Sequence, residues 1–325
     1  MDKRRIAKKL VYAFITIFFV LLFNFFLFRV LPGDIVSMVS RGGKATPEML
    51  ENIRRMYGLH LPWYQQFFVY LKNLSAGDLG MSFLYKKPVI DVIGTRILPT
   101  VVLLGFAELL AILIGILFGV ISAWKRGKPL DTGLLSTSLL LYSMPTFWLG
   151  MMLILAFCVY LKALPISGMV TPGRLFVNQW AQLQDMTRHM VLPMMCLTLG
   201  MIGEYAITMR STMIDVLSED YITTAKAKGF SERYVLRYHA VPNAMLPMIT
   251  LIAINLGMIV GGAIQVETVF SWPGLGSLMY SALVNRDYPL LQGVFLLSTV
   301  AVVFANFLSD ILYEIVDPRV RSMGG

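Results

Sequence analysis

Long apolar runs with almost no charged residue recur along this chain, and polar segments separate them. The runs cover residues 10–31, 98–123, 133–161, 190–211, 245–269 and 290–315. A helix needs about 20 apolar residues to cross the roughly 30 Å of hydrocarbon in a bilayer. The pattern therefore predicts an all-α polytopic membrane protein with six transmembrane helices.

Composition supports this class. The 325 residues are 57% hydrophobic and 14% charged, whereas soluble domains carry about 25% charged residues. The formal net charge is +9, but the basic residues lie beside apolar runs, where membrane topology and anionic lipid explain them better than nucleic acid does. Cys158 and Cys196 lie in apolar runs and the three histidines lie far apart, so neither a disulfide framework nor a metal site is predicted.

Positive charge also predicts the orientation. It precedes the first run and follows the second, fourth and sixth, at Lys3, Arg4, Arg5, Lys8, Lys9, Lys125, Arg126, Lys128, Arg210, Lys226, Lys228, Arg233, Arg237, Arg319 and Arg321. Cytoplasmic segments carry an excess of lysine and arginine, so both termini are predicted to be cytoplasmic. The first run exceeds the apolar core of a signal peptide, about 7–15 residues. Residues 1–31 are therefore predicted as a cytoplasmic amino end and a first, uncleaved transmembrane helix.

Residues 32–97 form a long polar segment, predicted to be an extracytoplasmic loop with short amphipathic helices. Thr46-Pro47 has the cap and first-turn proline of a helix that Gly58 would close. Pro62 would open a second helix that includes Trp63 and Phe67. The loop could be a lid that covers the bundle or a docking surface for an external partner, and the sequence favours neither.

Residues 98–325 are predicted to be a five-helix core. Glu108 and Glu204 lie near the middle of two of its apolar runs, where an ionisable group is costly and normally faces a cavity or a partner. Hydrogen-bonded packing residues are an equally good interpretation of both.

Small residues and prolines predict how the core helices pack. The pairs Gly115-x-x-x-Gly119 and Gly257-x-x-x-Gly261 would let helices approach closely. Pro145 and Pro193 are expected to kink or begin their helices.

The sequence has no phosphate-binding loop and no arrangement typical of a nucleophilic or metal-dependent enzyme. Uphill transport by this chain would need a partner or an ion gradient. An intramembrane enzyme would need converging acid, base or metal ligands, and a gradient-driven transporter usually shows two related halves with broken spans. Neither pattern is visible.

The cytoplasmic loop 212–244 is predicted to hold two short helices. Val216, Leu217, Tyr221, Ile222 and Ala225 share a helix face, and Gly229 is placed to end that helix. Small residues followed by basic and aromatic ones would make a protruding knob. Such a knob could insert into a cleft on another protein, or anionic lipid head groups could hold it.

The same loop resembles the EAA loop of ABC-importer permeases. Thr224–Gly229 is followed by His239-Ala240-Val241-Pro242, as in that motif, although Thr223 and Thr224 stand where Glu and the first Ala are usual, and His239 and Val241 replace Ile and Leu. Glu219–Phe230 resembles the oligopeptide/dipeptide/nickel permeases of the B-subunit type. Further segments that match this subfamily in order and placement are Leu31–Asp34, Gly77–Ser82, Phe270–Gly276, Arg286–Pro289 and Asp317–Arg321.

The resemblance implies a type I ABC importer permease in a prokaryotic cytoplasmic membrane. Its partners would be a second, homologous permease subunit, two cytoplasmic ATPase subunits, an extracellular solute-binding protein and membrane lipid, without nucleic acid. The chain would be non-catalytic and without a cofactor, and ATP and Mg would bind to the ATPases. Short peptides would be the solute, with oligosaccharides or a nickel chelate as alternatives.

Two groups of site residues are expected. The resemblance assigns ATPase coupling to Tyr221, Thr224, Ala225, Ala227, Lys228, Gly229, Phe230, Arg233 and Pro242. Candidates for the translocation path or its outer mouth are Glu108, Glu204, Trp272, Pro273 and Gly274.

Overall fold

The computed structural model describes residues 3–30 and 61–316, together with residues 46, 48, 51 and 55. The only β pairing in these residues is an isolated bridge between Met81 and Pro88. Five helical segments are long and apolar enough to cross a membrane. They are α1 (Lys3–Val30), α5 (Val89–Trp124), α8 (Gln179–Leu217), α11 (Val241–Met258) with the helical turns before it, and α14 (Tyr288–Val316). The predicted all-α membrane architecture is confirmed.

A bent pair of helices makes a sixth span if its two parts are counted as one. α6 (Pro129–Ser143) is followed by α7 (Thr146–Ile154) and the π-helical turn η1 (Leu155–Tyr160), and the two parts are bent by 100°. The bend lies at Met144, whose ψ of 133° is extended. A residue before a proline avoids the helical region, so Pro145 explains the break. Pro193, in contrast, lies inside α8 and does not begin it.

The fifth apolar run does not form one helix to residue 269. α11 ends at Met258, and a 3-10 turn (Ile259–Gly261) and the short helix α12 (Ile264–Val269) follow. Gly262 between them has φ +74°, and a Cβ there would lie 2.7 Å from the backbone nitrogen of Gly276. Close approach of a second chain segment therefore breaks the run, which its apolar composition alone does not indicate.

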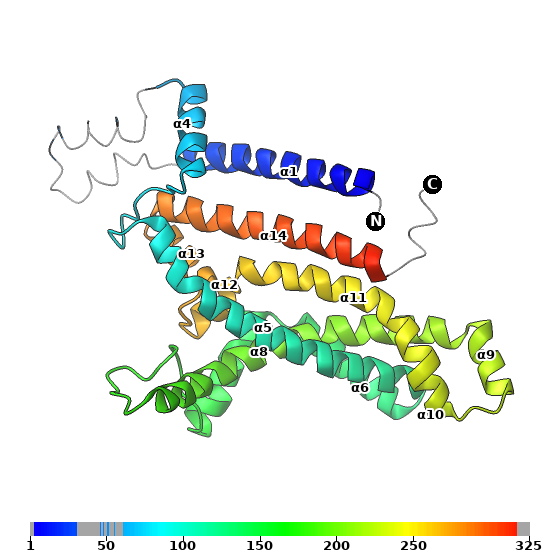
Figure 1. The fold of residues 1–325 in the computed structure, drawn as a ribbon. Helices are drawn as coiled ribbons and strands as arrows, with labels where there is room; N and C mark the ends of the chain where they lie inside the picture. The colour runs from blue at the N-terminus through cyan, green and yellow to red at the C-terminus, as the bar shows by residue number, and fades with distance from the viewer. Residues whose placement is uncertain are drawn as a thin grey trace.

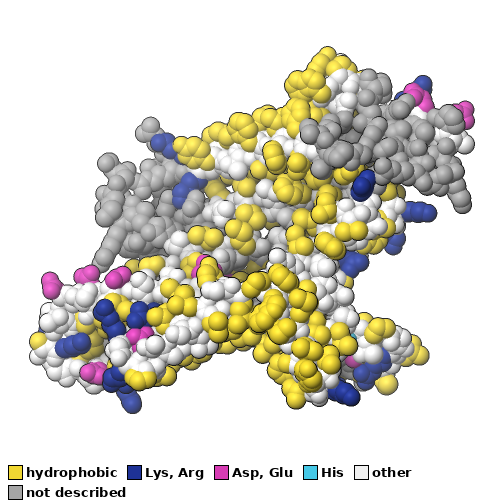
Figure 2. Space-filling view, turned by 180° about the vertical axis from the view of Figure 1, so that it is seen from behind, with side chains coloured by type: hydrophobic (Ala, Val, Ile, Leu, Met, Phe, Trp, Pro, Cys, Tyr) yellow, Lys and Arg dark blue, Asp and Glu magenta, His cyan; other side chains and the backbone are white. Residues whose placement is uncertain are grey.

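The remaining elements lie at the two ends of the bundle. They are α4 (Trp63–Ser75), α9 (Asp220–Ala227), α10 (Glu232–Val235), the π-helical turn η2 (Leu236–Ala240) and α13 (Leu275–Val284). Figure 1 shows α9 and α10 at the same end as the start of α1 and the end of α14, with α4, α12 and α13 toward the opposite end. Charged side chains gather near the ends in Figure 2, and the surface between them is mostly apolar.

Helices α5 and α8 pack closely at two glycines of α5. A Cβ on Gly119 would lie 2.5 Å from Cβ of Met209, and one on Gly115 would collide with Cβ of Tyr205. This confirms the predicted close approach at the first glycine pair. In the second pair, Gly257 packs against Ala305 of α14, whereas no atom of the described residues lies within 4 Å of a Cβ on Gly261.

α4 lies across one end of α1 (Figure 1). The ring of Phe67 contacts Phe18 and Phe25 edge to face, with ring centroids 6.4 and 5.2 Å apart. Trp63 and Phe68 remain exposed. The predicted helix after Pro62 is confirmed, whereas the one expected from Thr46 to Gly58 falls mostly outside the described residues.

Candidate functional site

The loop between α8 and α11 contains two short helical segments, as the sequence predicts. α9 ends at Ala227, and Gly229 follows with φ +82°, a conformation that favours glycine. Ser231 then caps α10, because its side chain accepts a 3.4 Å hydrogen bond from the backbone nitrogen of Tyr234. The chain continues through η2 into α11, so the loop ends directly in a membrane span.

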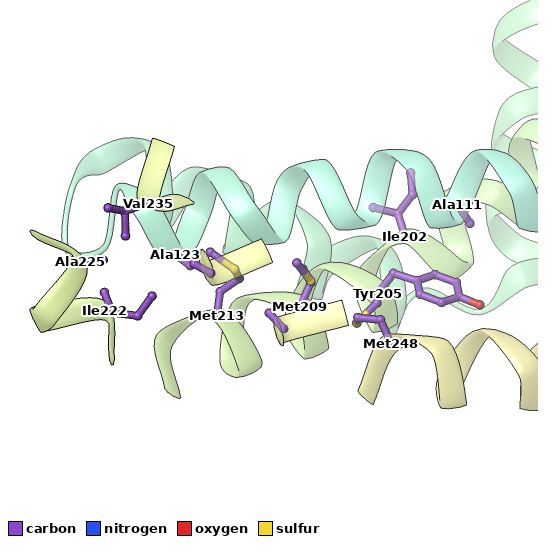
Figure 3. Packing of buried hydrophobic residues seen from close by; sticks show 12 residues of the cluster. Ala111, Ala123, Ile202, Tyr205, Met209, Met213, Ile222, Ala225, Val235 and Met248 are labelled. Atoms are coloured by element: carbon purple, nitrogen blue, oxygen red, sulfur yellow. The ribbon is translucent and has the colours of Figure 1, made fainter. Parts of the chain in front are cut away.

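The inner side of α9 is anchored in a hydrophobic cluster. Ile222 and Ala225 are buried against residues from α5, α8 and α10, among them Ala123, Met213 and Val235 (Figure 3). The backbone hydrogen bonds of α9 lie within the helix and its caps. The apolar contact of Ile222 and Ala225 therefore holds α9 against the bundle. A displacement of α9 would therefore also move the adjoining ends of α5 and α8.

The outer side of the loop is exposed. Thr224, Ala227, Lys228 and Arg233 are exposed, and Pro242 is exposed in the first turn of α11. Ala225, in contrast, is only 6% exposed, so of the two small residues in the expected knob only Ala227 can meet another protein.

Exposed rings form a ladder beside the same surface. Phe230 stacks on Tyr234 and Tyr234 packs on Tyr238, each with ring centroids 4.8 Å apart. All three side chains are at least 42% exposed. Among the coupling residues the resemblance includes only Phe230, but the spacing of four residues could have indicated the ladder.

A polar cluster joins α5, α8 and α11 among the core spans. The Tyr205 hydroxyl donates to Oε1 of Glu108 and accepts a 3.0 Å hydrogen bond from Nδ2 of Asn255, which also lies 3.3 Å from Oε2 of Glu204. Glu108 is fully buried and Glu204 is half-buried. The two predicted carboxylates thus belong to one cluster. Neither Asn255 nor Tyr205 was predicted from the sequence, although an amide in an apolar run, as at Asn255, is a signal.

The segment Phe270–Gly276 is packed into the fold. Trp272 is 1% exposed, and its indole nitrogen donates a 3.0 Å hydrogen bond to the carbonyl of Pro99 in α5. Gly274 is buried on the carboxylate of Glu267, which a Cβ at this position would strike, and Pro273 is half-buried. The Trp272 side chain is therefore covered by the chain itself.

Glu267 organises this segment and was not found from the sequence. Its Oε1 accepts a 2.8 Å hydrogen bond from the hydroxyl of Thr100, and its Oε2 accepts a 2.9 Å bond from the backbone nitrogen of Ser277. An acidic residue in an apolar run followed by a Trp-Pro-Gly sequence could have signalled it. The buried carboxylate joins α12 and α13 to α5.

Two segments that carry the resemblance meet at the end opposite the loop. The hydroxyl of Ser82, from Gly77–Ser82, donates a 2.6 Å hydrogen bond to Asp287, from Arg286–Pro289. The backbone nitrogen of Leu84 donates to the same oxygen at 3.0 Å. Asp287 therefore joins the segment before α5 to the start of α14.

Comparisons with known proteins cover nearly all of the chain. Residues 115–322 match the family described as "Binding-protein-dependent transport system inner membrane component", and residues 3–105 match its amino-terminal companion. The di/tripeptide transport system permease protein DppB of Pseudomonas aeruginosa is 37% identical over 97% of this chain and 98% of its own length. The oligopeptide transport system permease protein AppB of Bacillus subtilis is 38% identical over 92% and 93%. The glutathione transport system permease protein GsiC of Escherichia coli K12 is 35% identical over 97% and 98%.

The fold also has a counterpart among solved structures. A chain of the inward-facing MetNI methionine ABC transporter superposes with a TM-score of 0.56 at 16% identity, over 70% of this chain and 97% of that one. At this identity the likeness shows the fold, that of an ABC importer permease.

Proposed function

Because the chain belongs to the inner membrane components of binding-protein-dependent transport systems, we propose that it imports oligopeptides or dipeptides as the permease subunit of an ATP-driven importer. It would form half of the translocation path, and a second, homologous permease subunit would form the other half. The names of the three relatives, which refer to di/tripeptides, oligopeptides and glutathione, favour peptides over oligosaccharides or a nickel chelate.

Membership of the family indicates the roles of the partner subunits. Two cytoplasmic ATPase subunits would bind ATP and Mg, and an extracellular binding protein would deliver the solute. This chain would itself be non-catalytic and would need no cofactor. Both of its termini would lie in the cytoplasm, on the side of α9.

The architecture of α9 carries the proposed coupling role. One side of the helix is anchored on α5 and α8 through Ile222 and Ala225, and the other side, with Thr224, Ala227 and Lys228, is exposed at an end of the bundle. An ATPase bound to the exposed side of α9 would therefore act directly on the spans α5 and α8. Gly229 ends the helix, and the ladder that begins at Phe230 extends the surface. The translocation path would open alternately to the two sides of the membrane as the spans of the two permease subunits tilt.

Purification of the chain in mild detergent, with every copurifying chain identified, tests the proposal. The complex reconstituted with its binding protein should take up labelled dipeptide only in the presence of ATP, and this chain alone should hydrolyse none. Unlabelled sugar and nickel chelate serve as competitors in the same assay. Uptake that is blocked by sugar but not by peptide would refute the peptide assignment, and a complex without any ATPase would refute the whole proposal.

A further inference from the structure

The polar cluster of Glu108, Glu204, Tyr205 and Asn255 has more acceptors than donors. The Tyr205 hydroxyl hydrogen is used on Glu108, and the Asn255 amide donates to both Tyr205 and Glu204. Oε2 of Glu108 is buried and has no hydrogen-bond partner among the described residues. Two carboxylates, which accept and do not donate when ionised, therefore share the donors of one phenol and one amide.

Among the described residues, no basic side chain forms an ion pair with either carboxylate. The ion pairs among the described residues involve Glu51, Asp131 and Asp185, and none includes Glu108 or Glu204. Acidic residues among membrane spans are normally paired or face a polar path, because an unpaired buried charge is costly. The described residues also contain no group of three metal-ligating side chains. A ligand with a positive charge and several hydrogen-bond donors would complement these two carboxylates.

Access to the cluster is graded. Glu108 is 0% exposed and is hydrogen-bonded to the Tyr205 hydroxyl, whereas Glu204 is only half-buried. Asn255 on α11 holds Glu204 at 3.3 Å. A ligand would reach Glu204 first.

The position of the cluster connects it to the loop. Glu204 and Tyr205 lie on α8, which leads into α9, and Asn255 lies on α11, which continues from α10 and η2. Figure 3 shows Tyr205 in the same row of buried side chains that extends to Ile222 of α9. A ligand that changed the contact between Glu204 and Asn255 would therefore act on both helices that border the loop.

We propose that Glu204, supported by Asn255, Tyr205 and Glu108, forms a subsite inside the permease for the ammonium group of the solute in transit. An ammonium group brings one positive charge and three N–H donors, which match the surplus of carboxylate acceptors. The amino terminus of a short peptide carries this charge at neutral pH, since its pKa is about 8 in the free state. The inference rests on the proposed import of peptides and adds to it a requirement for a free amino group.

Equilibrium dialysis of the assembled complex, without binding protein or nucleotide, tests the subsite with labelled dialanine. Acetylation of the peptide amino group should raise Kd at least about tenfold, because it removes a charge-assisted contact. Glu204→Gln should raise Kd for dialanine by a similar factor and should abolish the difference between the free and acetylated peptides. A merely structural role of Glu204 would not produce this loss of discrimination.

Controls separate the possible sources of the cation. Asp91→Asn removes an exposed carboxylate at the start of α5 and should leave Kd unchanged. An acetylated dipeptide with a lysine side chain should recover binding if any ammonium group suffices. Displacement of dialanine by potassium chloride at equal concentration would instead assign the site to an inorganic cation and overturn the proposal.

Glu204→Asp keeps the charge and should retain the preference for the free amine if Glu204→Gln fails to assemble. Equal binding of both peptides to the wild-type complex, or no binding to it, refutes the subsite. If that complex still takes up peptide with ATP and binding protein, the proposed function survives. If it takes up none, the proposed function fails independently.

Discussion

The guanidinium group of Arg210 on α8 holds both carboxylate oxygens of Asp131 on α6, with Nε 2.8 Å from Oδ1 and Nη2 2.9 Å from Oδ2. The hydroxyl of Ser122 and the backbone nitrogen of Gly127 donate to the same carboxylate. Three helices, α5, α6 and α8, are thus connected through one acidic side chain near the end of the bundle that carries the loop.

The pair of Asp131 and Arg210 predicts that substitutions at the two residues have non-additive effects on stability. Asp131→Ala should destabilise the complex by about 3 kcal/mol, because it leaves the partly buried guanidinium of Arg210 unpaired. The double variant Asp131→Ala with Arg210→Ala should cost less than the sum of the two single variants. Thermal unfolding in detergent measures the stability of each single variant and of the double variant. Glu51→Ala, which breaks the exposed pair with Arg55, is the control, and additive losses at Asp131 and Arg210 would contradict the prediction.

The contact of α5 with α8 predicts which glycines tolerate a side chain. Gly119→Val should lower stability by about 1–3 kcal/mol or prevent folding, because even a Cβ would lie 2.5 Å from Met209. Gly105→Val, on the same helix but with nothing within 4 Å of its Cβ, should cost less than about 1 kcal/mol. Folded yield and thermal midpoint in detergent compare the two. Equal losses would show that helix propensity, not packing, decides.

The anchor of α9 predicts a local loss of order. Ile222→Ala removes a fully buried side chain and should cost about 2–4 kcal/mol of local stability, whereas Thr223→Ala on the exposed side should be nearly neutral. Hydrogen exchange should show faster exchange in α9 and unchanged protection in the middle of α8. We also expect the Ile222 variant to keep its ATPase partner and to transport less. Unchanged exchange in α9 would mean that the cluster does not hold it.

Gly229 predicts a separation of membrane insertion from coupling. Gly229→Val forces a branched side chain into φ +82°, which costs about 1–2 kcal/mol and should alter the end of α9. We expect normal membrane insertion with strongly reduced uptake and peptide-stimulated ATP hydrolysis. Gly173→Val, at φ +72° in the loop before α8 and with open space around its Cβ, controls for backbone strain alone. Uptake and stimulation that both survive in the Gly229 variant would refute the docking role of the loop.

The local features of the chain were predictable. The lengths of the apolar runs placed the spans, Pro145 marked the break between α6 and α7, and Gly229 marked the end of α9. Hydrophobic length and the backbone preferences of proline and glycine are properties of a short stretch, so the sequence contains them directly. The boundaries were less accurate, because α5 and α8 begin before their apolar runs, at Val89 and Gln179, and α11 ends before its run does, at Met258.

Only the tertiary structure decided which side chains meet. Arg210 is hydrogen-bonded to Asp131, which is separated from it by 79 positions in the sequence. Ser82 is hydrogen-bonded to Asp287 across 205 positions, because helices distant in the chain pack side by side. The same packing turned Ala225 and Trp272 inward, although the first was expected on a docking surface and the second at an outer mouth. A single sequence specifies each helix and its apolar content, but the side chain that completes a polar or charged group belongs to another helix, and its identity depends on how all of them assemble.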